Sequence, residues 1–344
     1  MKRNPIYSIQ ENSMIPMNRH LERRRMGLSA VLLGLVAGLV VVPVAQSAPD
    51  TQAASLSTAP NMGTPEGTAA LVKTASALGL GAGEFHLGMP ADEAIATLKS
   101  QGYLANPAPE VGVFSFGISQ VPDQAFVGGA AGFLGNTAGS ITTTVNLNFT
   151  MYPNTPVVSA IERRIVYPES KAPTIATTLA ALRKKYGPES KTTHETLFWF
   201  YDHQGHRLSK AAIDHLQRSC PQISASSAIE PIGDRGHVAD RITQGFPGIS
   251  GINLICLNAL YVTASMSGKS IANGQRSSAA QGWDKVSEDL MTQLIVDIYD
   301  MPLEYSASTV SRNLIEHNDA AKKQKESDAA KRRPVDVGEE DAAK

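Results

Sequence analysis

The sequence contains only two cysteines, Cys220 and Cys256, and neither lies near its N-terminus. A lipid anchor on an N-terminal cysteine is therefore excluded. Charge of one sign is lacking as well, because 31 basic and 32 acidic side chains leave a formal net charge of −1. Such a balance gives no indication of nucleic acid or of an acidic partner, since both attract a basic surface.

Motifs of catalysis and cofactor binding are also missing. No serine stands in the Gly-x-Ser-x-Gly pattern of a nucleophile elbow. Residues 268–270 match only the end of a phosphate-binding loop, because Thr263 occupies the place of its first glycine. Acidic residues are plentiful, but their spacing pairs no two of them as acid and base. We predict no catalytic residues and no cofactor, and an enzymatic role is uncertain and less favoured.

One long apolar run lies near the N-terminus. Residues 26–44 carry no charge, follow three consecutive arginines and precede the small residues 45–48. A basic segment, an apolar segment and a small-residue cleavage site are typical of an export signal. We expect residues 1–47 to be this signal and the protein to be periplasmic or secreted. The alternative is an uncleaved anchor in the inner membrane, because residues 26–44 can just span a bilayer.

Composition divides the rest of the chain into three parts. Residues 49–66 are rich in Thr, Ala, Ser, Pro and Gly, and we expect residues 48–82 to form a flexible linker. Residues 68–80 could add a short helix, but the glycines at its end argue against a long one. Residues 83–305 are enough for one large core or two small ones. Residues 306–344 are rich in Ala, Lys, Asp and Glu and are expected to form a charged tail, helical or disordered.

Hydrophobic periodicity predicts the order helix, strands, helix, strands. Apolar residues recur every three to four positions over residues 173–186, as in a helix, and alternate over residues 145–151, as in a strand. The following strand loses this period near Glu162, where we expect a bulge. We predict an α+β fold in which an antiparallel sheet carries helices on one face. Residues 83–168 and 169–305 are two possible similar units in tandem.

The first predicted helix begins with a recognisable pattern. Residues 85–94 read FHLGMPADEA and lead to a helix end at Gly102 and Tyr103. This pattern resembles the helix starts of small bacterial envelope proteins, namely the beta-lactamase-inhibitor-like fold and the small lipoprotein of the outer-membrane assembly machine. Residues 185–188 are similar to the end of such a repeat, and the chain after the signal resembles uncharacterised exported proteobacterial proteins. The resemblance implies a binding scaffold, a fold that does not by itself fix function.

The densest group of polar residues surrounds His203. Asp202, His203 and His206 lie within five residues, and zinc accepts both imidazole and carboxylate ligands. Their spacing fits no established zinc signature, and Gly205 favours a hairpin turn at this place. Two interpretations stay open, a solvated turn or the metal site of a metal-binding protein or metal-dependent hydrolase.

Two further features are candidates for structural or functional roles. An oxidising compartment favours a disulfide between Cys220 and Cys256 over two buried thiols. The Gly-rich residues 128–139 carry no charge and place Phe133 beside Leu134. We interpret them as a hairpin loop folded over the sheet or as a contact loop for a partner or a membrane surface.

These observations together favour an exported cell-envelope protein that acts as a non-enzymatic binding or scaffold module. Its partner would be another envelope protein or a small ligand, and membrane anchoring is expected only if the signal stays uncleaved. The competing hypothesis is the metal-dependent role of His203 and His206.

Overall fold

The computed structural model describes residues 59–106, 115–116, 119–120, 129–135, 139–150, 152–193, 196–220, 257–277 and 282–332. The expected export signal lies outside these residues. The described residues all belong to one compact unit. Within these ranges, no helix combines the length and the apolar character needed to cross a membrane.

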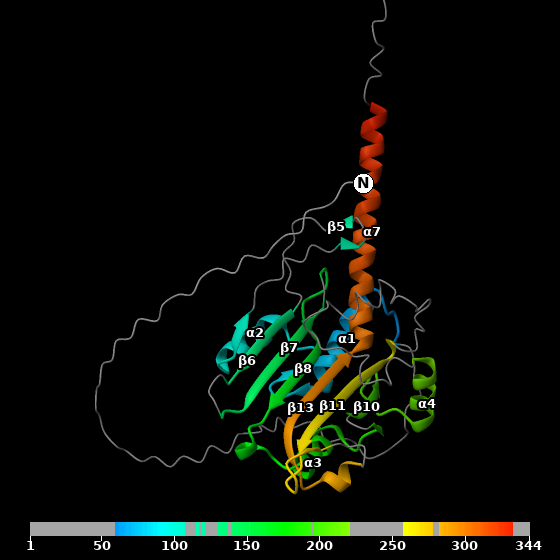
Figure 1. Ribbon diagram of the computed structural model, residues 1–344. Helices are drawn as coiled ribbons and strands as arrows, with labels where there is room; N and C mark the ends of the chain where they lie inside the picture. The colour runs from blue at the N-terminus through cyan, green and yellow to red at the C-terminus, as the bar shows by residue number, and fades with distance from the viewer. Residues whose placement is uncertain are drawn as a thin grey trace, which may run out of the picture. The chain divides into compact units, whose positions relative to one another are not determined.

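A nine-stranded antiparallel sheet forms the centre of the structure (Figure 1). Its strand order is β3-β6-β7-β8-β13-β11-β10-β9, with β12 paired to β11. The strands are β3 (Leu104–Asn106), β6 (Gly129–Leu134), β7 (Thr142–Phe149), β8 (Val158–Val166), β9 (Lys191–Thr192), β10 (Thr196–Asp202), β11 (Ala259–Lys269), β12 (Arg276–Ser277) and β13 (Leu290–Asp300). Two small hairpins join β1 (Gly81–Ala82) to β2 (Phe85–His86) and β4 (Ser115–Phe116) to β5 (Ser119–Gln120). The predicted α+β class with an antiparallel sheet is confirmed.

The pairing of β8 corrects one local expectation. Its register with β7 and β13 is continuous through Glu162, so the bulge expected there is wrong. The register shift lies instead where Asn148 and Phe149 of β7 face Ala160 and Val158, so that Ser159 of β8 is the extra residue. Because side chains alternate along an unbroken strand, Glu162 and Arg164 share one face of the sheet and Arg163 lies on the other.

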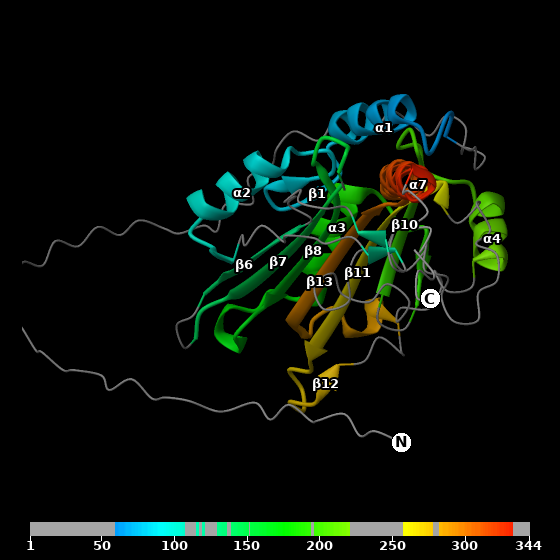
Figure 2. The ribbon, with the colours of Figure 1, turned by 90° about the horizontal axis from the view of Figure 1, so that it is seen from above.

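Helices cover both faces of the sheet, and not one face alone as expected. On one face, α1 (Pro65–Leu78), α2 (Ala91–Ser100) and α3 (Ile175–Tyr186) contribute to the larger hydrophobic cluster (Figure 2). On the opposite face, α4 (Lys210–Ser219) packs over β10 and β11 in a smaller cluster. The α4 helix begins where the Ser209 hydroxyl accepts a hydrogen bond from the Ala212 N–H, the usual role of an N-cap serine.

Helix α1 corrects the expected linker at residues 48–82. Thr64 caps this helix through the Gly67 N–H, and Gly79 ends it in the left-handed conformation, with φ of 59°. Leu71 and Ala75 are buried in the larger cluster, one helical turn apart. A flexible linker is therefore wrong for residues 65–78. Residues 65–78 are only weakly apolar in composition, but their few large side chains lie on one face of the helix. Gly79 ends the helix rather than preventing it.

Helix α7 (Met301–Arg332) directly continues the last central strand. The Asp300 side chain accepts a hydrogen bond from the Leu303 N–H at 2.9 Å and so caps the helix. Leu303, Ala307 and Val310 are buried, whereas the residues from Glu316 onward are mostly exposed and extend beyond the sheet (Figure 1). The boundary expected at residue 306 is therefore not a boundary, because one helix belongs both to the core and to the tail.

The two possible units share one sheet. Residues 83–168 provide β3, β6, β7 and β8, and residues 169–305 provide β9, β10, β11 and β13. The two sets of strands meet where β8 pairs with β13, and the larger hydrophobic cluster draws side chains from both. They therefore fold on a common core, and their similarity to each other stays a prediction.

Candidate functional site

The Gly-rich segment is largely a strand rather than a loop. Residues 129–134 form β6, which pairs with β3 on one side and with β7 on the other. Gly132 permits this, because a Cβ atom there would lie 2.7 Å from Leu98 Cδ2 and 3.0 Å from Tyr103 Cβ. The loop expected at residues 128–139 is therefore wrong for residues 129–134. Small residues are needed in this strand because it approaches α2 closely.

Phe133 and Leu134 lie on opposite faces of β6, and both are exposed, by 38% and 39%. Phe133 faces Leu104 across the β3–β6 pair, and Leu104 is 66% exposed. Thr144 of β7 lies opposite Phe133 on one side and opposite Arg164 of β8 on the other. Val166 follows Arg164 by two residues, so it points to the same face, and it is 42% exposed. We refer to Leu104, Phe133 and Val166 as the exposed patch.

The exposed patch borders a row of polar side chains on the same face. Asn146, Glu162, Asp297 and Thr263 lie opposite one another on four adjacent strands. The Thr263 hydroxyl donates a hydrogen bond of 3.1 Å to Asp297 Oδ2, and Arg164 Nη2 lies 3.8 Å from Glu162 Oε1. Burial, and then the neighbouring Glu162, raises the pKa of Asp297 to about 7.

Two adjacent carboxyl groups that share a proton can act in acid–base chemistry. Here Glu162 is 2% exposed and Asp297 is 9% exposed, which favours a structural role over contact with a substrate. No sequence pattern points to this pair, because its members are far apart in the chain and only the β8–β13 register brings them together.

The residues around His203 form a tight turn. Asp202 Oδ1 accepts hydrogen bonds from the N–H groups of Gln204 and His206 at 2.8 and 2.9 Å, and Asp202 Oδ2 lies 3.2 Å from His206 Nδ1. Gly205 supplies the left-handed position, with φ of 85°. The carboxylate is thus engaged by its own turn, as in an Asx-turn. In the described parts of the chain, no three His, Cys, Asp or Glu side chains gather so as to hold a metal ion.

Cys220 is fully buried at the C-terminal end of α4. It belongs to the same hydrophobic cluster as Ala259, the first residue of β11. Cys256 lies three residues before that strand and outside the described residues. The bridge between the two cysteines therefore stays a prediction, favoured by the position of Cys220 beside the start of β11.

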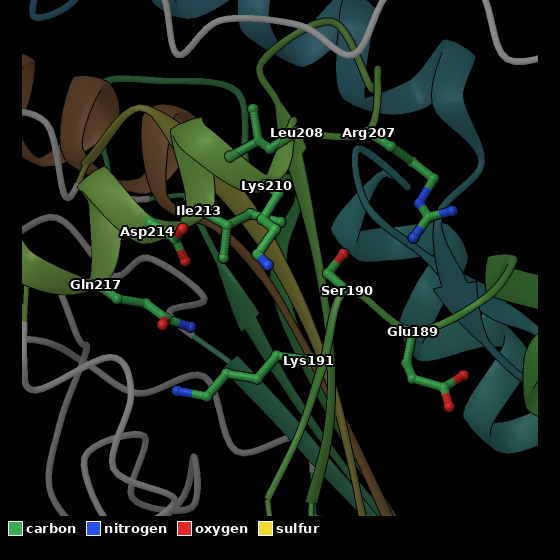
Figure 3. Close-up of a pocket in the computed structure, with 9 residues that line it drawn as sticks. All are labelled: Glu189, Ser190, Lys191, Arg207, Leu208, Lys210, Ile213, Asp214 and Gln217. Atoms are coloured by element: carbon green, nitrogen blue, oxygen red, sulfur yellow. The ribbon is translucent and has the colours of Figure 1, made fainter.

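A pocket of about 440 Å³ lies between α4 and the strand segment that precedes β10 (Figure 3). It is lined by Glu189, Ser190, Lys191, Arg207, Leu208, Lys210, Ile213, Asp214 and Gln217. Figure 3 shows Lys210 extending from α4 toward Ser190 and Lys191 on the opposite wall. Two apolar and seven polar or charged side chains suit a small polar ligand better than an apolar one.

Part of the charge in this pocket is already paired. Arg183 donates two hydrogen bonds to the Glu189 carboxylate, at 2.9 and 2.6 Å, and they lower the pKa of Glu189. Arg207 donates to the Pro188 carbonyl. Lys191 and Lys210 have no ion-pair partner among the described residues. Sequence reasoning did not identify this pocket, because its lining comes from two separate segments, residues 189–191 and 207–217, without a shared motif.

No protein-family model matches the chain, and comparisons with curated proteins and with solved structures find no significant match. The resemblance of residues 85–94 to small envelope proteins therefore stays a prediction.

Proposed function

We propose that this chain is an exported cell-envelope protein that acts as a non-enzymatic binding module. Its partner is another envelope protein, and the contact surface is the exposed patch. The single observation that carries this proposal is the cross-strand pair of Leu104 and Phe133, two large apolar side chains exposed side by side. Apolar side chains gathered on the surface of a soluble protein are typical of an interaction site.

The surroundings of the exposed patch support binding to a protein. Arg164 lies on β8 beside Thr144 on the same face, and its side chain is 40% exposed. Arginine and aromatic residues are enriched at protein interfaces, whereas lysine and glutamate are depleted. Because the patch residues lie on paired strands, their backbone is already ordered before binding. Ordered contact residues lower the entropic cost of association.

Residues 1–47 support the cellular location in this proposal. A basic segment, an uncharged apolar run and a small-residue site together favour cleavage after Ser47. We expect protein purified from the envelope to begin near Ala48. Mass spectrometry of the intact protein measures this directly, and a mass that retains residues 26–44 would establish the membrane anchor instead.

The contact surface is tested by paired variants of β6. Phe133→Ala should reduce capture of a partner from envelope extract by the purified protein, and Leu104→Ala should do the same. Leu134→Ala is the matched control, because Leu134 is equally exposed on the same strand but faces the opposite way. Since these side chains are already exposed, the free energy of unfolding should change by no more than roughly 0.5 kcal/mol.

Each outcome of this experiment has a defined meaning. Selective loss of capture with unchanged stability supports the exposed patch as the contact surface. Equal capture by all variants contradicts it. A clear loss of stability in Phe133→Ala, without loss of capture, would give Phe133 a structural role.

A further inference from the structure

A second group of charged side chains lies on the face of the sheet that α1, α2 and α3 cover. Arg163 comes from β8, Lys185 from the last turn of α3, and Glu84 from the turn between β1 and β2. Tyr103 follows α2 and completes the group. These four residues, named here the Arg163 cluster, come from four separate elements and lie on the opposite face from the exposed patch.

The turn between β1 and β2 holds the guanidinium of Arg163 in place. A Cβ atom on Gly83 would lie 2.0 Å from Arg163 Nη1, so the guanidinium lies directly against the backbone of the turn. Arg163 Nη2 is 3.9 Å from Glu84 Oε2, which is beyond hydrogen-bond distance. Arg163 Nε is buried and makes no hydrogen bond within the described part of the chain. The arginine is thus positioned by packing, with donor capacity left over.

Lys185 adds a second positive charge, which interacts electrostatically with Arg163. Burial, and then the charge of Arg163, lowers the pKa of Lys185 to about 8, while Glu84 acts in the opposite direction. The Lys185 ammonium also lies 5.5 Å from the ring centre of Tyr186. The positive charges of Arg163 and Lys185 therefore repel each other in a half-buried cluster that contains one carboxylate, that of Glu84.

Tyrosines provide the remaining polar groups around the two cations. Tyr103 is 6% exposed, and its hydroxyl interacts with both Glu84 and Arg163. Burial raises the pKa of Tyr103 to about 12, so its hydroxyl stays protonated and can donate at neutral pH. Burial also raises the pKa values of Tyr167 and Tyr186, both of which sense the charge of Arg163. Neither tyrosine adds a negative charge, so Arg163, Lys185 and Glu84 together leave the cluster with one excess positive charge.

We propose that the Arg163 cluster binds a small oxyanion, the carboxylate or phosphate group of a small ligand. Arg163 and Lys185 are its charged donors, and the Tyr103 hydroxyl, which interacts with Glu84 in the free protein, becomes its neutral donor when the anion displaces Glu84. The anion supplies the second negative charge that the two cations lack, and hydrogen bonds between ions are the stronger ones. Glu84 competes with the ligand for Arg163. This site goes beyond the proposed contact with an envelope protein and is independent of it, because the two lie on opposite faces of the sheet.

Titration calorimetry of the purified full chain with inorganic phosphate, and separately with acetate, tests this site at constant ionic strength and pH 7. Lys185→Met should weaken binding by about tenfold, the effect of losing one hydrogen bond between ions. Lys184→Met is the matched control, because Lys184 is exposed on the same turn of α3 and should leave binding unchanged. Glu84→Gln should tighten binding, since it removes the competing carboxylate.

The direction of each change decides the outcome. Saturable binding of either anion, weakened by Lys185→Met and tightened by Glu84→Gln, supports the site, and the anion that binds more tightly identifies the ligand group. Binding that changes equally in Lys184→Met and Lys185→Met would overturn it, as would the absence of saturable binding of both anions. If Lys185→Met unfolds at a lower temperature than the control, Lys185→Gln replaces it, and Glu84→Gln remains an independent test.

Discussion

Glu162 of β8 and Asp297 of β13 lie directly opposite each other on adjacent antiparallel strands, and both carboxyl groups are buried. Opposed carboxylates repel each other, and burial adds a desolvation cost to the charged form of each. The Thr263 hydroxyl and Arg164 offset part of this cost for Asp297, but its pKa stays raised to about 7. The middle of this sheet face is therefore sensitive to pH.

Asp297→Asn should stabilise the protein at pH 8 and have little effect at pH 4. In the folded protein Asp297 holds its proton up to a pH of about 7, whereas its ordinary pKa is 3.8. Between these values the folded state binds more protons than the unfolded state. The free energy of unfolding therefore falls as pH rises, by up to about 1.4 kcal/mol for each pH unit. The amide removes this dependence and can still accept the Thr263 hydrogen bond.

Denaturant unfolding of the two proteins between pH 4 and pH 8 measures this effect. Asp214→Asn is the control, because Asp214 is exposed on α4 and should leave the slope unchanged. Asp300, whose pKa burial also raises to about 7, keeps its own share of the slope in the variant. An Asp297→Asn protein that is less stable than the wild type at pH 8 would contradict the prediction.

Lys185 should react with an acylating reagent at lower pH than an ordinary lysine does. The neutral amine is the nucleophile, and a pKa of about 8 makes half of Lys185 neutral near pH 8. A lysine with the usual pKa of about 10.4 is almost fully protonated there. Labelling from pH 6 to pH 10, followed by peptide mass spectrometry, should give Lys185 a profile with its midpoint near pH 8. The exposed neighbour Lys184 provides the comparison in the same peptide, and identical profiles would contradict the prediction.

The local sequence pattern predicted which residues form helices and strands better than it predicted which elements pack together. The alternation at residues 145–151 and the helical period at residues 173–186 correspond to β7 and α3, because each pattern depends only on neighbouring side chains. The glycines after residue 78 argued against a long helix where α1 has 14 residues. Strand β6 was obscured by glycines that are needed where the strand approaches Leu98. In both cases tertiary packing outweighs the local signal.

The candidate sites depend on contacts that sequence spacing does not encode. Glu162 and Asp297 come together only through strand register, and Arg163 and Lys185 only because α3 packs against the sheet. Phe133 was singled out as an apolar residue in an unusual segment, and the structure leaves it exposed. Its exposed neighbour Leu104 was not, because the pairing of β3 with β6 joins residues far apart in the chain.

Gly205→Ala should destabilise the protein more than Gly139→Ala does. Both glycines have positive φ, 85° and 76°, so both variants strain the backbone by roughly 1–3 kcal/mol. Only at Gly205 would the new Cβ also collide, at 2.1 Å, with Leu78 Cδ2 at the end of α1. Nothing lies within 4 Å of a Cβ at Gly139. Thermal or denaturant unfolding of the two variants measures the difference, and equal losses would show that Leu78 gives way freely.

The same turn allows the metal hypothesis to be tested. If Asp202 serves only its own turn, Asp202→Ala should lower the free energy of unfolding by about 1–3 kcal/mol, because two backbone N–H groups lose their acceptor. His203→Ala should then have little effect on stability, and elemental analysis of the wild type should find no stoichiometric metal. Stoichiometric zinc that disappears in His203→Ala would instead support a metal-binding protein or hydrolase.

The purified protein should contain no titratable thiols when it is denatured without reductant. Cys220 is fully buried in a cluster that also contains Ala259, which places the end of α4 beside the start of β11. Cys256 precedes that strand by three residues, and an oxidising compartment allows the two to join. A bridge would close a loop of about 37 residues and add up to about 4 kcal/mol to the free energy of unfolding. Reduction should therefore lower the unfolding midpoint of the wild type, but not that of a Cys220→Ala, Cys256→Ala double variant. Two thiols per chain in the unreduced protein would show that both cysteines are free, and the packing of Ala212, Ile213 and Leu216 would then hold α4 against the sheet without a covalent link.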